Sequence, residues 1–226
     1  MLTYLNQEKG HAVCGVLFDM DGVVIDTEKL YTRFWMEAAR ELGHPMTLEQ
    51  ALQMRSLGRG PSQEKLDSFF GPGVLEYDVL RSRRIKLMDA FIAVHGVEEK
   101  PGIRALLAHL KEKNIPCAIT SSSSIPLIRE HLGNLGLLEG FTALCSGKDV
   151  PHGKPAPDIY LAGAAAIGVA PENCLAIEDS PAGIEAAWRA GCMPIIVPDQ
   201  DQPSNEVLSR CFARADSLFD VMELIG

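Results

Sequence analysis

Two aspartates one residue apart, Asp19 and Asp21, stand where an apolar run of the sequence ends. The run from Val13 to Phe18 is short and rich in strand-forming residues, which predicts a buried β-strand. Gly22 then breaks the strand and exposes the residues just before it. One carboxylate could act as a nucleophile and the other as a general acid and base. The alternative interpretation is a polar turn, because Asp and Gly are ordinary turn residues.

Further polar groups follow apolar runs later in the chain. Ser121 ends one such run, Lys154 lies in a loop, and Glu178 with Asp179 ends another run. Ligands of open α/β sheets bind beyond the carboxyl ends of the strands, so we expect these groups to converge at one edge. A buried cluster of their carboxylates with those of the first strand would repel itself without cations. Lys154 and a Mg²⁺ ion would supply the missing positive charge.

The elements that must position these groups alternate along the chain. From residue 101 onward, short apolar strands alternate with helices, which predicts an α/β fold with a doubly wound parallel sheet covered by helices on both faces. Strands are expected at 116–121, 143–145, 174–177 and 194–197, and helices at 101–113, 125–134, 157–167, 181–190 and 217–224.

Between the first strand and residue 97, the sequence predicts helices only. Gly and Pro residues separate four segments with helical periodicity, at 28–42, 48–54, 63–69 and 77–94. We therefore expect a small helical-bundle cap domain at residues 28–96, inserted into an α/β core formed by residues 1–27 and 97–226. The length of 226 residues allows both domains.

Charge and composition restrict the partners of the protein. A net charge of −9 disfavours nucleic acid and means that an anionic substrate needs local basic groups and a metal. The longest small-apolar stretch, residues 161–170, is too short to span a bilayer, and residues 1–10 lack a signal-peptide pattern. We expect a cytoplasmic protein with no membrane or nucleic-acid partner. No heptad seam is evident, which favours a monomer.

The six cysteines are scattered without a C-x-x-C pair, which argues against a zinc site or a disulfide framework. Cys14, Cys117 and Cys174 lie within or beside apolar runs, where cysteine behaves as a small hydrophobic residue. We expect structural thiols.

The run from Phe18 to Glu28 resembles the first motif of the haloacid dehalogenase superfamily. Within that superfamily, the run is most similar to the branch that contains β-phosphoglucomutase and the small sugar-phosphate phosphatases. Thr120-Ser121, Lys154-Pro155 and Glu178-Asp179 resemble the later motifs and occur in the expected order. The resemblance extends from about residue 13 to residue 197.

The resemblance implies a role for each matching residue. Asp19 would take the phosphoryl group as an aspartyl phosphate, and Asp21 would protonate the leaving oxygen and then activate water. Ser121 and Ser122 would bind the phosphoryl group, and Lys154 would neutralise its developing charge.

A Mg²⁺ site is implied by the same motifs. Relatives that cleave carbon–halogen bonds lack the second aspartate, so Asp21 indicates phosphoester chemistry. The implied metal ligands are Asp19, Asp21 through its backbone carbonyl, Glu178 and Asp179.

The implied function is that of a Mg²⁺-dependent phosphatase of small phosphorylated metabolites, with sugar phosphates as the expected class. Arg59 and Arg83 fall near cap positions where a mutase holds the distal phosphate of its substrate, so they are candidate substrate ligands. A phosphoglucomutase-type transferase and a non-catalytic binding protein are the alternatives. Tyr31 and Ile125 stand where the mutase carries a histidine and an asparagine, which favours the phosphatase.

Overall fold

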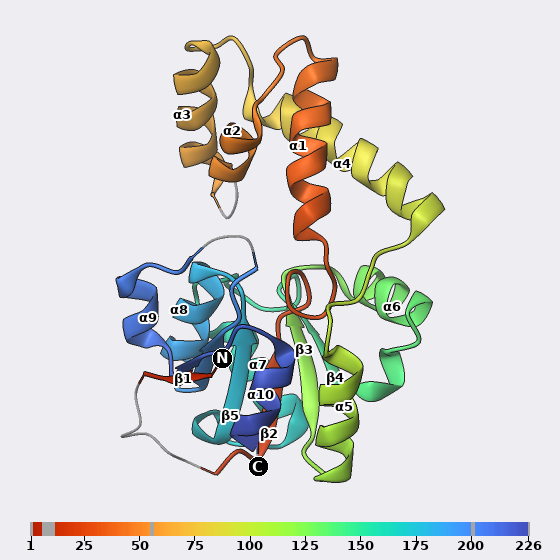
Figure 1. Cartoon of the computed structure of the whole chain (residues 1–226), viewed down its shortest axis with the longest axis vertical. Coiled ribbons are helices and arrows are strands. Elements are labelled where there is room, and N and C mark those ends of the chain that lie inside the picture. Colours follow the sequence, from red (N-terminus) through yellow and green to blue (C-terminus); the bar gives the residue numbers. More distant parts are fainter. Residues whose placement is uncertain (1, 6–11, 55–56, 200–201, 226) are drawn as a thin grey trace. The chain divides into compact units, whose positions relative to one another are not determined.

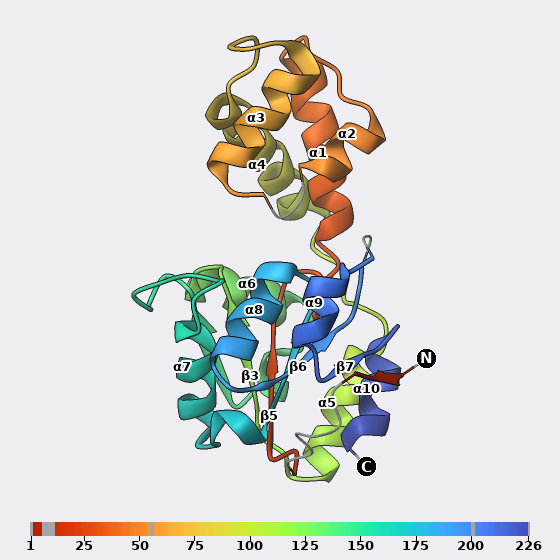
Figure 2. The same cartoon turned by 90° about the vertical axis from the view of Figure 1, so that its left-hand side faces the viewer.

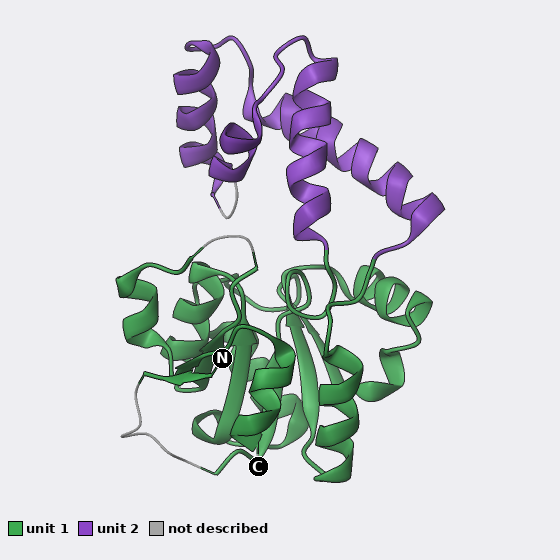
Figure 3. Ribbon diagram, in the orientation of Figure 1, with its two compact units in different colours: residues 1–26, 98–226 green, residues 27–97 purple. Residues whose placement is uncertain are grey.

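The computed structural model describes residues 2–5, 12–54, 57–199 and 202–225, which form two compact units (Figure 3). Unit 1 comprises residues 1–26 and 98–226, and unit 2 comprises residues 27–97. Each boundary lies one residue from the position expected from the sequence. The sequence predicts no signal peptide in residues 1–10. Most of these residues lie outside the part of the chain that the structure describes.

Unit 1 is built around a parallel sheet (Figure 1). In the described part of the chain, seven strands follow the order β1-β7-β6-β5-β2-β3-β4. Their bounds are β1 Thr3–Tyr4, β2 Gly15–Phe18, β3 Cys117–Ser121, β4 Ala143–Ser146, β5 Cys174–Glu178, β6 Met193–Ile196 and β7 Ala213–Arg214. Every neighbouring pair is parallel except β1 with β7. The predicted doubly wound α/β sheet is therefore confirmed, with an antiparallel edge strand that was not predicted from the sequence.

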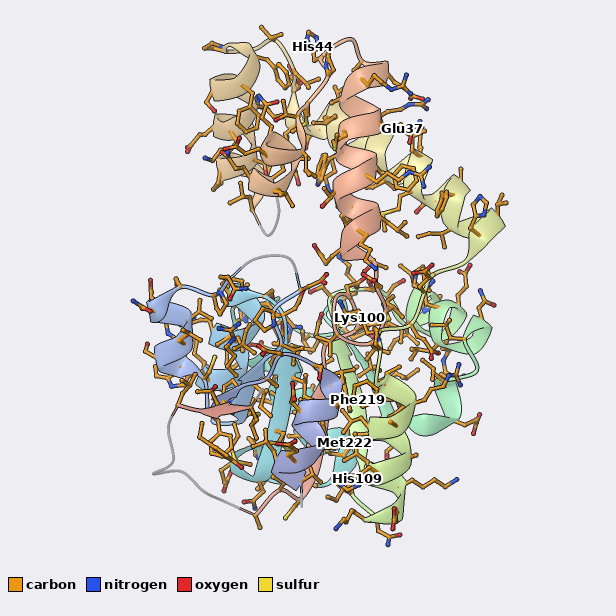
Figure 4. The ribbon with its side chains drawn as sticks, viewed as in Figure 1. Glu37, His44, Lys100, His109, Phe219 and Met222 are labelled. Carbon is orange, nitrogen blue, oxygen red and sulfur yellow. The ribbon has the colours of Figure 1, made fainter. Side chains whose placement is uncertain are left out.

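Helices cover both faces of this sheet (Figure 2). Helix α7 contacts β2, β3 and β4, and α8 beside it contacts β5 and β6; α5 and α10 pack together on the opposite face. Figure 4 labels His109 on α5 and both Phe219 and Met222 on α10. The helices are α5 Ile103–Glu112, α6 Ile125–Asn134, α7 Asp158–Ile167, α8 Pro181–Arg189, α9 Asn205–Arg210 and α10 Leu218–Ile225, with short 3₁₀ turns η2 Leu138–Gly140 and η3 Pro171–Asn173.

Local chemistry explains where two of these helices begin. Helix α8 starts at Pro181, where a missing N–H costs nothing, and the Ser180 hydroxyl accepts a hydrogen bond from the Gly183 N–H. Helix α5 starts at Ile103, after Gly102 adopts a φ of 94° that suits glycine. The expected start at residue 101 was therefore two residues early.

Unit 2 is a helical bundle with its own apolar core. It comprises α1 Glu28–Glu41, α2 Leu48–Gln53, α3 Arg59–Phe70 and α4 Tyr77–His95. Trp35, Ala38, Leu66 and Leu80 are among its buried residues. A capping box, in which Thr47 and Gln50 exchange hydrogen bonds, fixes the start of α2. The predicted start of the third helix, at residue 63, was four residues late.

The cysteines differ in how deeply they are buried. Cys117, Cys174, Cys192 and Cys211 are buried, as small hydrophobic residues should be. Cys14 is exposed because it lies just before β2 begins, which corrects the expectation that it packs like a strand residue. No helix among the described residues combines the length and the apolar character needed to cross a membrane.

Candidate active site

Strand pairing brings the predicted polar groups to the carboxyl edge of the sheet. β2 lies between β3 and β5, and Phe18 is in register with Ile119 on one side and Ile177 on the other. The backbone N–H of Asp19 continues the β5 side of the ladder by donating to the Ile177 carbonyl at 3.0 Å. Residues one or two positions beyond these partners therefore share one edge.

Three carboxylates meet at this edge. Oxygens of Asp19, Glu178 and Asp179 all lie within 4.8 Å of one another. Gly22, with a φ of 81°, makes room for this approach, because a Cβ there would lie 2.1 Å from Asp179 Oδ2. Asp21 follows Asp19 on the same loop, half-buried, and its carboxylate is not one of the three. Clustered carboxylate oxygens suit a hard divalent cation such as Mg²⁺.

Lys154 neutralises part of this charge. Its Nζ lies 2.5 Å from Asp19 Oδ1 and 2.6 Å from Glu178 Oε1, and its side chain is only 9% exposed. Burial alone would lower the pKa of Lys154, but the two carboxylates raise it above its usual value. Burial raises the pKa of Asp19 to about 8, although Lys154 opposes the change. Burial therefore disfavours the ionised form of Asp19 even beside Lys154, and a further positive charge would favour that form.

Glu178 is fully buried and surrounded by donors. Its Oε1 accepts from Lys154 and from the Tyr160 hydroxyl at 2.5 Å, and its Oε2 accepts from the Ser180 hydroxyl at 3.0 Å. A Cβ on Gly183 would lie 1.8 Å from Oε1, so only glycine fits there. Burial and the Glu178 carboxylate raise the pKa of the Tyr160 hydroxyl well above its usual value, which keeps it a donor.

A serine loop follows β3. The Ser121 hydroxyl accepts from the Ser123 N–H at 3.1 Å, and the Gly147 N–H donates to the Ser121 carbonyl at 2.7 Å. The Ser123 hydroxyl donates to Asp21 Oδ2 at 3.5 Å. Ser124 occupies the N-cap position of α6, so Ser121 lies before the helix and is not its cap.

Ser122 is exposed on the same loop. Ser146, at the end of β4, donates through its hydroxyl to the Ser123 carbonyl at 2.8 Å. The loop is therefore fixed from the neighbouring strand. Sequence reasoning missed Ser123 and Ser146, because neither a serine in a polar loop nor a serine at the end of a strand has a distinguishing spacing.

Tyr160 and Gly183 were also missed. Both lie within predicted helices, where a tyrosine is usually a core residue and a glycine a neutral interruption. Nothing in the sequence near either position marks contact with Glu178.

The predicted cap residues lie in unit 2 with carboxylate partners. Arg59 pairs with Asp78, and Arg83 pairs with Glu41. A phosphate that binds either arginine would have to compete with that arginine's carboxylate partner.

Arg84 differs from the neighbouring Arg83 in its burial and in its contacts. It is buried, with its guanidinium carbon 4.6 Å from the ring centroid of Tyr31 and 4.7 Å from that of Trp35. Its Nε has no hydrogen-bond partner among the described residues. Burial lowers its pKa from the usual value.

The fold and site first define a class: an α/β protein whose polar site lies at the carboxyl ends of parallel strands. The sequence model of the haloacid dehalogenase-like hydrolases matches residues 15–191, and the chain belongs to this family. The resemblance inferred from the motifs is thereby confirmed.

Proteins similar in sequence and in structure are consistent with membership of this family. Hexitol phosphatase A of Escherichia coli (strain K12) is 34% identical over 196 residues, covering 85% of this chain and 88% of the relative. Beta-phosphoglucomutase of Bacillus subtilis (strain 168) is 34% identical over 194 residues, covering 83% and 84%. The crystal structure of CbbY from Rhodobacter sphaeroides in complex with phosphate has a TM-score of 0.69 at 26% identity, covering 92% of this chain and 96% of that one.

Proposed function

We propose that this hydrolase is a Mg²⁺-dependent phosphatase of small phosphorylated metabolites, with sugar phosphates as its substrate class. The observation that carries the proposal is the cluster of Asp19, Glu178 and Asp179 with Lys154 in contact with two of them. Membership of the hydrolase family and the likeness to a hexitol phosphatase support it.

Asp19 is the proposed nucleophile. Its carboxylate attacks phosphorus, the bond from phosphorus to the ester oxygen breaks, and Asp21 gives that oxygen a proton. Asp21 then takes a proton from a water molecule that attacks the aspartyl phosphate. The Asp19–phosphorus bond breaks, which releases inorganic phosphate and restores both carboxyl groups. Ser121, Ser122 and Lys154 bind and orient the phosphoryl oxygens in both steps.

The acidic residues form the proposed metal site. Asp19, Glu178 and Asp179 would hold Mg²⁺ through their carboxylates, and Asp21 through its backbone carbonyl. When bound, the ion supplies positive charge that stabilises the transferring phosphoryl group. The pKa of Asp19, raised to about 8 by burial, supports the need for that charge.

Residues 28–96 are proposed as a cap domain that selects the substrate. Arg59 and Arg83 remain the proposed ligands for a distal phosphate or other anionic group. Arg84 is a third candidate, because its buried Nε lacks a partner in the described structure. A cytoplasmic location and a monomeric state also remain predictions.

A phosphoryl-transferring mutase is the second candidate, because a beta-phosphoglucomutase is as similar in sequence as the hexitol phosphatase. Tyr31 and Ile125, which replace a histidine and an asparagine expected of a mutase, favour hydrolysis. A purely binding function would leave the Asp19 carboxylate without a chemical role.

The test is phosphate release from a panel of sugar phosphates, nucleotides and phosphorylated acids, with Mg²⁺ and with EDTA. β-Glucose 1-phosphate is included with a bisphosphate primer, and formation of glucose 6-phosphate is measured. Mg²⁺-dependent release that is strongest for sugar phosphates supports the phosphatase. Isomerisation without release supports the mutase, and no turnover of any compound contradicts both enzymatic proposals.

A further inference from the structure

Tyr160 brings a buried hydroxyl to the acidic cluster from the body of the fold. It lies in the first turn of α7 and is fully buried. Leu17, Ala118 and Ala164 belong to the same core cluster, so its ring has apolar neighbours. A phenylalanine would satisfy that environment, whereas a buried hydroxyl costs free energy unless it finds a partner.

Glu178 accepts the hydrogen bond that this hydroxyl donates. The Tyr160 hydroxyl donates to Oε1 at 2.5 Å, and Lys154 Nζ donates to the same oxygen at 2.6 Å. The Lys154 Nζ also lies 5.1 Å from the centroid of the Tyr160 ring, within range of a cation–π interaction. One side chain therefore contacts both an acidic and a basic member of the cluster.

The position of the hydroxyl is fixed by close packing of α7 on the sheet. A Cβ on Gly163, one turn after Tyr160, would lie 2.6 Å from Thr120 Cγ2 and 3.2 Å from Leu17 Cδ2. Glycine at this position allows the helix to approach β2 and β3 closely. The Tyr160 hydroxyl is thus held against Glu178 by the backbone, and not only by the hydrogen bond.

We infer that Tyr160 is a positioning residue of the catalytic centre, which holds Glu178 and Lys154 in the arrangement that binds the divalent cation. The inference rests on the proposed function, because the cation site is part of it. Donors that orient a ligating carboxylate typically change metal affinity by about 10- to 100-fold when removed. Without the hydroxyl, Glu178 keeps Lys154 and Ser180 as donors and loses the one donor that comes from α7.

The test is direct Mn²⁺ binding to the metal-free protein, measured by electron paramagnetic resonance without substrate. Tyr160→Phe removes only the hydroxyl and keeps the ring in the core. Tyr4→Phe is the matched control, because it removes the same hydroxyl group at a position outside the acidic cluster. Tyr4 lies in β1, at the edge of the sheet, and is 45% exposed. Circular dichroism at the temperature of the titration establishes that all three proteins are folded.

We expect Tyr160→Phe to weaken Mn²⁺ binding by about tenfold. The concentration of Mg²⁺ that half-activates phosphate release should rise by the same factor, and Tyr4→Phe should match the wild type in both. Wild-type Mn²⁺ affinity in folded Tyr160→Phe overturns the inference, as does an equal loss in both variants. Failure of the wild-type protein to bind Mn²⁺ instead overturns the proposed metal site, so the two failures are distinguishable.

Discussion

The Lys154 ammonium lies 2.5 Å from the Asp19 carboxylate, although 135 residues separate them in the chain. Asp19 follows β2, and Lys154 lies between β4 and α7, so the sheet and the helix together bring them into contact. The contact gives the proposed nucleophile its nearest counter-charge. It also places a cation where a phosphoryl group bound to Asp19 would need one.

Lys154→Met should lower the rate of phosphate release by about 100- to 1,000-fold, because removing one preorganised donor from a buried site typically costs that much. The measurement is steady-state hydrolysis of the best substrate of the panel. Lys113→Met is the control, since this exposed lysine follows α5. A Lys154→Met rate within a few-fold of the control would remove Lys154 from the mechanism.

Mg²⁺ binding should release protons near neutral pH. Burial raises the pKa of Asp19 to about 8, so a cation that binds this carboxylate must compete with a proton near neutral pH. The affinity for Mg²⁺ should therefore increase as the pH rises toward that value and level off above it. Calorimetric titrations in two buffers of different ionisation enthalpy measure the released protons. Affinity that is independent of pH would contradict an Asp19 ligand with this pKa.

Gly183→Ala should disrupt the site, because its Cβ would lie 1.8 Å from Glu178 Oε1 and force that carboxylate away from Lys154 and Tyr160. We expect a free energy of unfolding lower by about 2 kcal/mol or more, together with weaker Mn²⁺ binding.

Gly133→Ala is the matched control for that substitution. Gly133 is also helical, and among the described residues a Cβ at this position would meet no atom within 4 Å beyond the backbone of its own helix. Alanine there should raise the free energy of unfolding by up to about 1 kcal/mol. Denaturant unfolding of both variants checks the pair; equal stabilities would contradict the packing of Glu178 against α8.

Thiol reactivity should follow burial. Burial raises the pKa of Cys117, Cys174, Cys192 and Cys211 to about 12, and the thiolate is the reactive form. In the folded protein a disulfide reagent at mildly alkaline pH should modify the exposed Cys14 fast and these four only after unfolding. Peptide mapping identifies the modified sites; rapid labelling of any of the four would contradict their burial.

The sequence was most informative where periodicity and composition agree. Helix α6 occupies residues 125–134 as predicted, because apolar spacing and a proline near its start indicate the same boundary. Helix α3 begins earlier than predicted, since Pro61 was interpreted as a break but lies in the first turn, where proline is tolerated. The two-residue strands β1 and β7 are too short to show alternation, and the pairing that defines them joins distant parts of the chain.

In the site, too, sequence patterns predict some features, whereas others depend on tertiary packing. The convergence of Asp19, Glu178 and Asp179 could be predicted, because each follows an apolar strand and parallel strands end at one edge. The role of Tyr160 could not, since it depends on how closely α7 packs on the sheet. The ion pairs of Arg59 and Arg83 likewise depend on helix packing in unit 2, which periodicity does not determine.

The most direct test of the proposed covalent mechanism is mass spectrometry of enzyme quenched with acid during turnover of its best substrate. We predict that the peptide containing Asp19 gains the mass of one phosphoryl group, localised to Asp19 and absent with EDTA. The Asp19→Asn protein should fold, bind substrate and show neither the adduct nor phosphate release. Turnover by Asp19→Asn, or a phosphoryl group on another residue, would contradict the mechanism.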